Sequence, residues 1–179
     1  MLKNLYLICG KSGSGKTWTV EKLHKEYGYE VLRSYTTRKP RNKNDKDHYY
    51  VMVSDYYADK ENGVMATDTC YRHNLYWSRI EQMETSDLYV IDRKGIQTLL
   101  DNKSKYRPFV VIYIDASENI RKKRMRLRGD TNYALNDRLD NDEEEFKNIK
   151  SYADFIVDGD SDDKWITIKN IIDKCEEVS

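Results

Sequence analysis

Glycine, lysine and threonine residues near the N-terminus have the spacing of a phosphate-binding loop. Residues 10–17 read GKSGSGKT, which fits the pattern G-x-x-x-x-G-K-[ST]. Glycines let the backbone wrap closely around a phosphate, and the N–H groups of such a loop point at the anion. Lys16 adds a positive charge, and the Thr17 hydroxyl can ligate Mg²⁺. The motif predicts a nucleotide-phosphate site formed by Gly10, Ser12, Gly13, Ser14, Gly15, Lys16 and Thr17.

The residues on either side of this motif, which we call the P-loop, agree with that interpretation. The apolar run at residues 5–9 is typical of a buried strand, and Val20, Leu23 and Tyr27 recur at helical spacing after the motif. A strand, a glycine-rich turn and the start of a helix therefore follow one another in the order that the motif requires.

A second set of residues suited to phosphate binding lies in the basic segment at residues 34–41, which reads SYTTRKPR. Arginine side chains bind phosphate oxygens with two parallel hydrogen bonds, so Arg38 and Arg41 can hold a phosphate group. Alone, two arginines three residues apart would indicate a solvated surface. Beside a P-loop, they favour a second phosphate site.

The whole chain has the composition of one soluble domain. It has 179 residues, with 31 basic and 31 acidic side chains, so no net charge favours nucleic acid or a membrane surface. No apolar run reaches membrane-spanning length, and the N-terminal one is too short for a signal peptide. Cys9, Cys70 and Cys175 form no C-x-x-C pair, so we expect buried thiols, a reducing compartment and a cytoplasmic location.

Short apolar runs alternate with helical patterns along the chain. We expect strands at residues 5–9, 30–34, 49–53, 88–91, 109–114 and 153–157. We expect helices directly after the P-loop and at residues 55–62, 78–86, 95–102, 119–127, 136–152 and about 165–175. Residues 64–78 give no clear pattern. This alternation predicts an α/β fold with a mostly parallel sheet flanked by helices. Ligands bind at the carboxyl ends of such strands, where the P-loop, the basic segment and Asp92 should meet.

Several further segments, taken in order, make the sequence similar to the guanylate kinases, a family of P-loop nucleoside monophosphate kinases. The family's S-x-x-T-R-x-x-R resembles residues 34–41, and its G-N-x-Y-G-[ST] resembles residues 73–78. Its D-I-D-x-x-G resembles residues 90–95, its R-L-x-x-R-G-T resembles residues 124–130, and a later R-L resembles Arg138 and Leu139. The resemblance covers nearly the whole chain.

The resemblance implies an enzyme that transfers the γ-phosphate of ATP, with Mg²⁺, to GMP or dGMP. Lys16, Arg128 and Arg138 would be catalytic, and Arg124 would bind ATP with the P-loop. The acceptor nucleotide would be bound by Ser34, Arg38, Arg41, Tyr50, Thr67, Tyr76, Ser78 and Asp92. One domain is implied, with a core at residues 1–33, 88–127 and 153–179, an acceptor-binding insertion at about 34–87 and a mobile lid at about 128–152. Its partners would be nucleotides, without nucleic acid or membrane, in a monomer or homodimer.

The chain departs from the family pattern mainly on the acceptor side. A glutamate that reads the guanine edge in the family is replaced by Thr67, next to Asp68. The phosphate-binding tyrosine of the family's D-Y-x-F falls on His48, with Tyr49 and Tyr50 as possible substitutes. Further differences are Trp77 for glycine, Asp158 for asparagine, and a lid one residue shorter between Arg128 and Arg138. Phosphoryl transfer from ATP is therefore implied more firmly than guanine as the acceptor base.

Two alternatives remain open from the sequence. A kinase of the same fold could use another nucleoside monophosphate or a phosphorylated sugar, because the guanine-reading glutamate is missing. A guanylate-kinase-like module that only binds phosphopeptides is the other, but such modules usually lose the P-loop lysine and the lid arginines, which this chain keeps.

Overall fold

A five-stranded parallel sheet forms the core of the computed structural model, which describes residues 2–41, 43 and 45–178. Its strands are β1 (Leu5–Cys9), β2 (Val31–Leu32), β7 (Leu88–Val90), β8 (Phe109–Asp115) and β9 (Phe155–Asp158), arranged in the order β2-β7-β1-β8-β9. Every neighbouring pair is parallel. The expected strand at residues 30–34 is present only as the two residues of β2.

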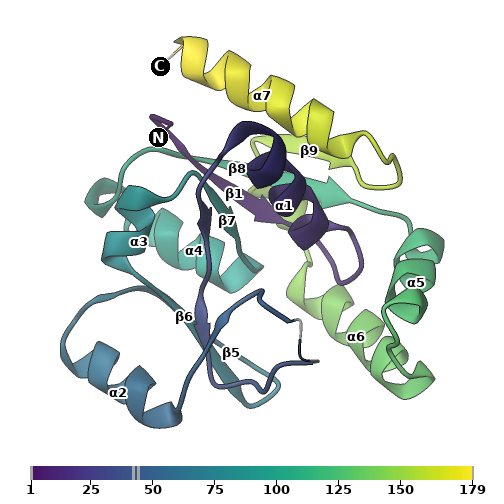
Figure 1. The fold of residues 1–179 in the computed structure, drawn as a ribbon, viewed down its shortest axis with the longest axis horizontal. Coiled ribbons are helices and arrows are strands. Elements are labelled where there is room, and N and C mark those ends of the chain that lie inside the picture. The colour runs from purple at the N-terminus through teal and green to yellow at the C-terminus, as the bar shows by residue number, and fades with distance from the viewer. Residues whose placement is uncertain (1, 42, 44, 179) are drawn as a thin grey trace.

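Helices cover both faces of this sheet, as the sequence predicts (Figure 1). Strand β1 is buried along its whole length, and its alternate side chains enter two different clusters. Leu5, Leu7 and Cys9 pack on the side of α4 (Arg93–Asp101), whereas Tyr6 and Ile8 pack on the side of α1 (Lys16–Tyr27) and α7 (Lys164–Val178). A strand buried on both faces reads as a continuous apolar run, which explains why residues 5–9 are all apolar.

A second, four-stranded sheet lies below the core in Figure 1. Its strands are β3 (Tyr35–Thr36), β4 (Tyr49–Tyr50), β5 (Met65–Tyr71) and β6 (Asn74–Arg79), in the order β4-β3-β6-β5, with α2 (Val53–Glu61) and α3 (Ile80–Thr85) beside it. Trp77 anchors this part of the molecule: its side chain is 1% exposed, and its Nε1 donates to Asp59 Oδ2 of α2 at 2.7 Å. Residues 64–78, which give no clear sequence pattern, thus form most of an antiparallel hairpin.

Two further helices, α5 (Glu118–Leu127) and α6 (Asn132–Glu145), project from the carboxyl end of β8 at the right of Figure 1. Short 3₁₀ turns occupy Lys103–Lys105 and Ile149–Ser151. Helix α6 begins four residues before the expected position 136 because Thr131 caps it, accepting a hydrogen bond from the Ala134 N–H at 3.2 Å. It ends at Glu145 instead of continuing to 152.

Three other expectations need correction. The strand expected at 49–53 covers only Tyr49–Tyr50, since Val53 already begins α2. The helix expected at 78–86 begins only at Ile80, because Ser78 and Arg79 belong to β6. Cys70 is exposed on β5 and not buried, as alternate residues of that strand face solvent. Within the described residues, no helix is long and apolar enough to cross a membrane.

Candidate active site

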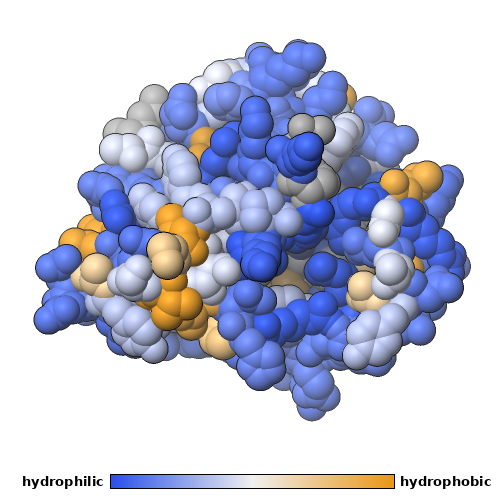
Figure 2. All heavy atoms as spheres, turned by 60° about the horizontal axis from the view of Figure 1, so that its bottom comes forward, coloured by the Kyte–Doolittle hydropathy of each residue, from blue (hydrophilic) through white to orange (hydrophobic). Residues whose placement is uncertain are grey.

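A cleft of about 1980 Å³ is lined by residues from both sheets and from α1, α5, α6 and α7. Most residues that the sequence assigns to nucleotide binding line it: Gly10, Ser12, Gly13, Gly15, Lys16, Thr17, Ser34, Arg38, Arg41, Thr67, Tyr76, Asp92, Arg124, Arg128 and Arg138. Ser14, Tyr50 and Ser78 are not in its wall. The face of the molecule in Figure 2 is largely hydrophilic, with hydrophobic residues in small patches.

The glycines of the P-loop allow close packing that no other residue would permit. Gly13 has a φ of 78°, and a Cβ at this position would lie 2.7 Å from the backbone oxygen of Arg121 on α5. Gly15 has a φ of 102° and immediately precedes α1. The loop is therefore held in a left-handed turn directly against α5, with its chain leading into a helix N-terminus.

The side chain of Lys16 folds back onto the P-loop and binds its backbone. Its Nζ donates to the carbonyl oxygens of Gly10 at 2.6 Å and Lys11 at 3.2 Å. Burial lowers the pKa of Lys16, and the negative charge of Asp142 opposes this effect. An ammonium group desolvated in this way interacts strongly with a nearby anion, which suits a lysine that meets a phosphate.

The Thr17 side chain fits a metal that is held mainly by a nucleotide. Thr17 lies in the first turn of α1 and lines the cleft next to Lys16. Within the described part of the chain, no group of three or more His, Cys, Asp or Glu side chains could hold a metal ion. Mg²⁺ commonly takes only one or two protein ligands, with phosphate and water oxygens completing its coordination, so a single hydroxyl is compatible with it.

Arg124 ties the P-loop to the segment after β9. Its NH1 donates to the carbonyl oxygens of Ser14 at 3.1 Å and Gly159 at 2.8 Å. Two other cleft residues on this side were missed by the sequence analysis: Lys164 is 2% exposed, and its Nζ lies 4.7 Å from the centre of the Trp18 ring. Trp18 directly follows the P-loop, and an aromatic residue at that place in the sequence was the available signal.

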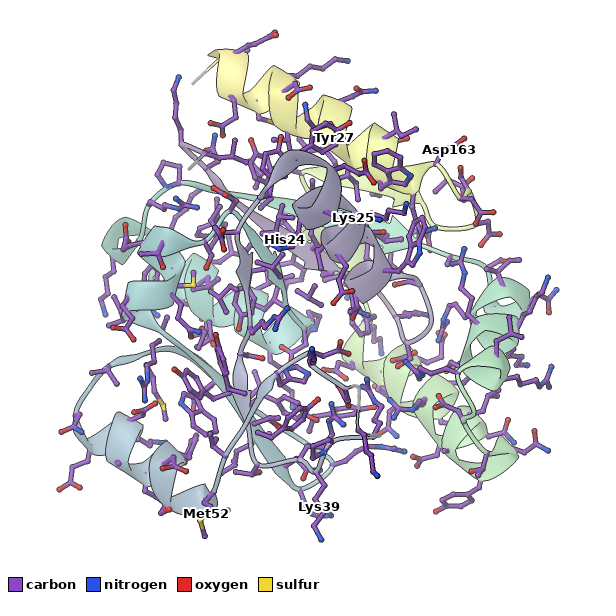
Figure 3. All side chains as sticks on the ribbon, in the orientation of Figure 1. His24, Lys25, Tyr27, Lys39, Met52 and Asp163 are labelled. Atoms are coloured by element: carbon purple, nitrogen blue, oxygen red, sulfur yellow. The ribbon has the colours of Figure 1, made fainter. Side chains whose placement is uncertain are left out.

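Arg38 and Arg41 face the cleft with carboxylates of their own segment beside them. Arg38 NH1 and NH2 each lie 3.2 Å from Asp45 Oδ2, and Arg41 NH1 lies 3.2 Å from Asp47 Oδ2. Burial alone would raise the pKa of Asp45. Hydrogen bonds from Tyr50 and from the Arg41 N–H, together with the charge of Arg38, instead hold that pKa well below its usual range. Lys39, by contrast, points to solvent at the lower edge of Figure 3.

His48 lies among the residues expected to bind the acceptor phosphate. Its Nδ1 is 2.8 Å from Ser34 Oγ, and its ring centre is 5.4 Å from that of Tyr76. Tyr49 also lines the cleft, whereas the Tyr50 hydroxyl accepts a hydrogen bond from Arg38 NH2 at 3.2 Å. Burial, followed by the positive charge of Arg38, lowers the pKa of His48 to about 4, so the imidazole is neutral near pH 7.

Hydroxyl groups occupy the position where the family glutamate would read the base. Thr67 Oγ1 lies 2.8 Å from Ser78 Oγ and 3.1 Å from the Tyr89 hydroxyl, so Ser78 sits behind Thr67. Asp68 is turned away and accepts from the Tyr56 hydroxyl at 2.6 Å. The carboxylate of Asp68 is therefore not directed into the cleft.

Asp92 is the carboxylate of this region that lines the cleft next to the hairpin. Its Oδ2 accepts from Thr69 Oγ1 at 2.9 Å, and its Oδ1 caps α4 by accepting from the Gly95 N–H at 2.7 Å. Glu145, at the end of α6, also lines the cleft and was not singled out from the sequence. Burial and then the charge of Asp92 raise the pKa of Glu145 to about 7.

The two arginines expected in the lid converge on Asp130. Arg128 NH2 lies 2.5 Å from Asp130 Oδ2, and Arg138 Nε lies 3.5 Å from the same atom. Burial is the main cause that lowers the pKa of Arg138, followed by the positive charge of Arg128. Two guanidinium groups thus share one carboxylate at the cleft, leaving positive charge available for a phosphate.

Comparison with known proteins finds a matching family model, several relatives and a similar solved structure. The family model described as AAA domain matches residues 5–156. A guanylate kinase from Nitratidesulfovibrio vulgaris is 29% identical over 164 residues, covering 86% of this chain and 78% of the relative. One from Mesomycoplasma hyopneumoniae is 26% identical over 190 residues, covering 97% and 95%. The fold matches the crystal structure of a guanylate kinase from Anaplasma phagocytophilum with a TM-score of 0.67 at 21% identity, covering 98% of this chain and 89% of that one. The chain therefore belongs to the AAA domain family of P-loop proteins, and it is similar to guanylate kinases over most of its length.

Proposed function

We propose that this protein is an ATP-dependent nucleoside monophosphate kinase that transfers the γ-phosphate of ATP to GMP or dGMP, giving ADP and the diphosphate. The observation that carries the proposal is the single cleft lined by the P-loop, by Arg38 and Arg41, and by Arg128 and Arg138. A phosphoryl group can move directly between two nucleotides only where both sets of phosphates meet in one space. The guanylate kinases to which the chain is similar support GMP as the acceptor.

On the donor side, the P-loop N–H groups and Lys16 would hold the β- and γ-phosphates. Mg²⁺ would be bound by the Thr17 hydroxyl and the nucleotide phosphates, and it would neutralise charge on them. Arg124, already fixed between Ser14 and Gly159, would lie beside the rest of the donor nucleotide.

On the acceptor side, Arg38, Arg41 and Tyr76 would orient the monophosphate so that one of its oxygens attacks in line. Ser34 and His48 would support that phosphate, while Tyr50 would act through its hydrogen bond with Arg38. Thr67 and Asp92 would lie beside the base, with Ser78 behind Thr67. The attacking oxygen is already anionic, so no general base is required. Catalysis then consists of alignment and charge neutralisation.

Residues 128–152 would form the lid over this reaction, between a core and an acceptor-binding insertion at about 34–87. Arg128 and Arg138 would bind the moving phosphoryl group in place of Asp130. An arginine in this role contributes about 10³–10⁵ in rate. Exclusion of water is also needed, because water would otherwise take the phosphoryl group.

The test is phosphate transfer from ATP with Mg²⁺ to GMP, dGMP, AMP, CMP, UMP and a sugar phosphate, measured side by side. We expect GMP or dGMP to be the best acceptor. Lys16→Ala should lower kcat by at least about 10²-fold without loss of fold, since Lys16 acts on the transferred phosphate. Lys174→Ala, at an exposed lysine of α7, is the control. Near-normal kcat in Lys16→Ala, or a sugar phosphate as the preferred acceptor, would contradict the proposal.

A further inference from the structure

A buried ion pair joins α5 and α6 directly behind the P-loop. Arg121 on α5 and Asp142 on α6 are each 2% exposed, and Arg121 NH2 lies 2.5 Å from Asp142 Oδ2. They stand 21 residues apart in the sequence, in a basic run and an acidic run that would ordinarily face solvent. Two charges removed from water in this way need further polar partners.

Those further partners are all on one residue of the P-loop. Arg121 Nε donates to the Ser12 carbonyl oxygen at 2.9 Å. Asp142 Oδ2 accepts from the Ser12 N–H at 2.8 Å, and Asp142 Oδ1 accepts from Ser12 Oγ at 3.1 Å. The ion pair therefore binds the N–H, the carbonyl and the hydroxyl of Ser12 together.

The same helix carries the lid arginine. Arg138 precedes Asp142 by one turn of α6, so both side chains lie on the same face of the helix, and both line the cleft. Ser12 is four residues before Lys16 in the P-loop. The contact between Ser12 and Asp142 thus joins the loop that carries Lys16 to the helix that carries Arg138.

Stability alone is a weak reason for this arrangement. A buried ion pair can often be replaced by packed apolar side chains without loss of stability, because the desolvation of both charges offsets their attraction. A pair whose other hydrogen bonds all go to the phosphate-binding loop is better explained by the geometry that it imposes.

We propose that Asp142 and Arg121 are positioning residues that fasten α6 to the P-loop, so that Arg138 is placed at the transferred phosphate and water is excluded from it. This inference rests on the proposed kinase function. Loosening α6 should slow transfer to the acceptor and at the same time let water compete for the phosphoryl group. A merely structural pair would affect stability without changing the ratio of hydrolysis to transfer.

The decisive variant combines Arg121→Met with Asp142→Leu. It replaces the ion pair by apolar side chains of similar volume. We expect a folded protein whose melting temperature is within a few degrees of the original, at least about a tenfold lower kcat for transfer, and a severalfold higher ratio of ATP hydrolysis to transfer. Hydrogen exchange of the α6 amides without nucleotide should be faster. Glu144→Gln, an exposed substitution on the same helix, should change none of these quantities.

Arg121→Lys is the second variant, needed if the double variant does not fold. It keeps the charge but loses the fork that binds Ser12 and Asp142 together, so we expect a folded protein with the same change in ratio. The inference would be overturned if the variant that folds shows unchanged rates of transfer and hydrolysis. It would also be overturned if that variant binds ATP more tightly and has a higher kcat, because Asp142 would then be an inhibitory contact. A wild-type protein that phosphorylates no monophosphate would instead refute the proposed kinase function, and unchanged α6 exchange in the variants would still refute the fastening of the helix.

Discussion

Arg38 holds Asp45 with two of its nitrogens, NH1 and NH2, each 3.2 Å from the same carboxylate oxygen. A carboxylate and a phosphate present similar oxygen atoms to a guanidinium group. Asp45 therefore accepts hydrogen bonds from Arg38 that an acceptor phosphate would otherwise accept.

Arg38→Ala and Arg41→Ala should each raise the KM for the acceptor by roughly 10- to 100-fold and change the KM for ATP much less. The estimate corresponds to the loss of one charge-assisted hydrogen bond of about 1.5–3 kcal/mol. Steady-state kinetics with each substrate varied in turn measures the split. Lys39→Ala, which removes the intervening solvent-facing charge, is the control. Weaker ATP binding with an unchanged acceptor KM would mean that donor and acceptor sides are exchanged.

His48 should make the protein less stable as the pH falls below neutrality. Its folded-state pKa is lowered to about 4, below the ordinary value of about 6.5, so the unfolded chain binds a proton in this interval that the folded chain does not. His48→Gln should therefore reduce the drop in melting temperature between pH 7 and pH 5 by about 4 °C. Calorimetry at several pH values tests this.

The control for that experiment is His73→Asn. His73 is exposed in the hairpin turn with a φ of 61°, a conformation that asparagine tolerates. The pH dependence of its melting temperature should equal that of the original protein. An equal dependence in His48→Gln as well would show that His48 titrates normally.

The selectivity of the protein for the base of the acceptor nucleotide should depend on Asp92, and this selectivity should be incomplete. Asp92→Asn keeps a good helix cap for α4 but removes the charge from the base site, so the preference for GMP over AMP should fall by roughly 10- to 100-fold. Thr67→Glu should restore a reading carboxylate and sharpen the preference for GMP. Asp101→Asn, an exposed substitution on the same helix, is the control. A protein already strictly selective for GMP and indifferent to both substitutions would place the base pocket elsewhere.

Gly13→Ala should destabilise the fold more than Gly63→Ala. Both glycines have positive φ, 78° and 65°, so each substitution carries a backbone cost of about 1–2 kcal/mol. Only at Gly13 would the new Cβ also meet a backbone oxygen, that of Arg121 at 2.7 Å, whereas nothing lies within 4 Å at Gly63. Chemical denaturation of the two variants measures the difference. Equal losses would mean that α5 moves away from the loop without cost.

The parts of the site that the sequence predicts are those encoded by adjacent residues. The P-loop, the pair Arg38 and Arg41, and Asp92 just after β7 each occupy one short segment, and each segment contributes residues to the cleft wall. The parallel order of the core strands likewise follows from the alternation of apolar runs and helices. The individual roles of these residues in catalysis stay predictions.

The features that the sequence does not predict depend on contacts between distant segments. The hairpin of β5 and β6 turns at Arg72 and His73, with φ of 51° and 61°, where the Asn-Gly or Asp-Gly signal of a tight turn is missing. The charged run on α5 resembles a solvated surface because the partner of Arg121 lies on another helix. Likewise, the place of Glu145 beside Asp92 requires the ends of α6 and β7 to be brought together.

Trp18 and Trp77 have different surroundings, so tryptophan fluorescence can report whether a nucleotide is bound. Trp77 is 1% exposed in the four-stranded sheet, whereas Trp18 is 44% exposed where α1 leaves the P-loop. Indole emission shifts to longer wavelength in water, so the two rings have separable spectra once Trp165, the third tryptophan, which also lines the cleft, is replaced by phenylalanine. A nucleotide that covers Trp18 would shift or quench the red component, and the blue component from Trp77 would follow changes in the four-stranded sheet. Events at the P-loop and in the four-stranded sheet can therefore be followed optically without a label in a Trp165→Phe variant.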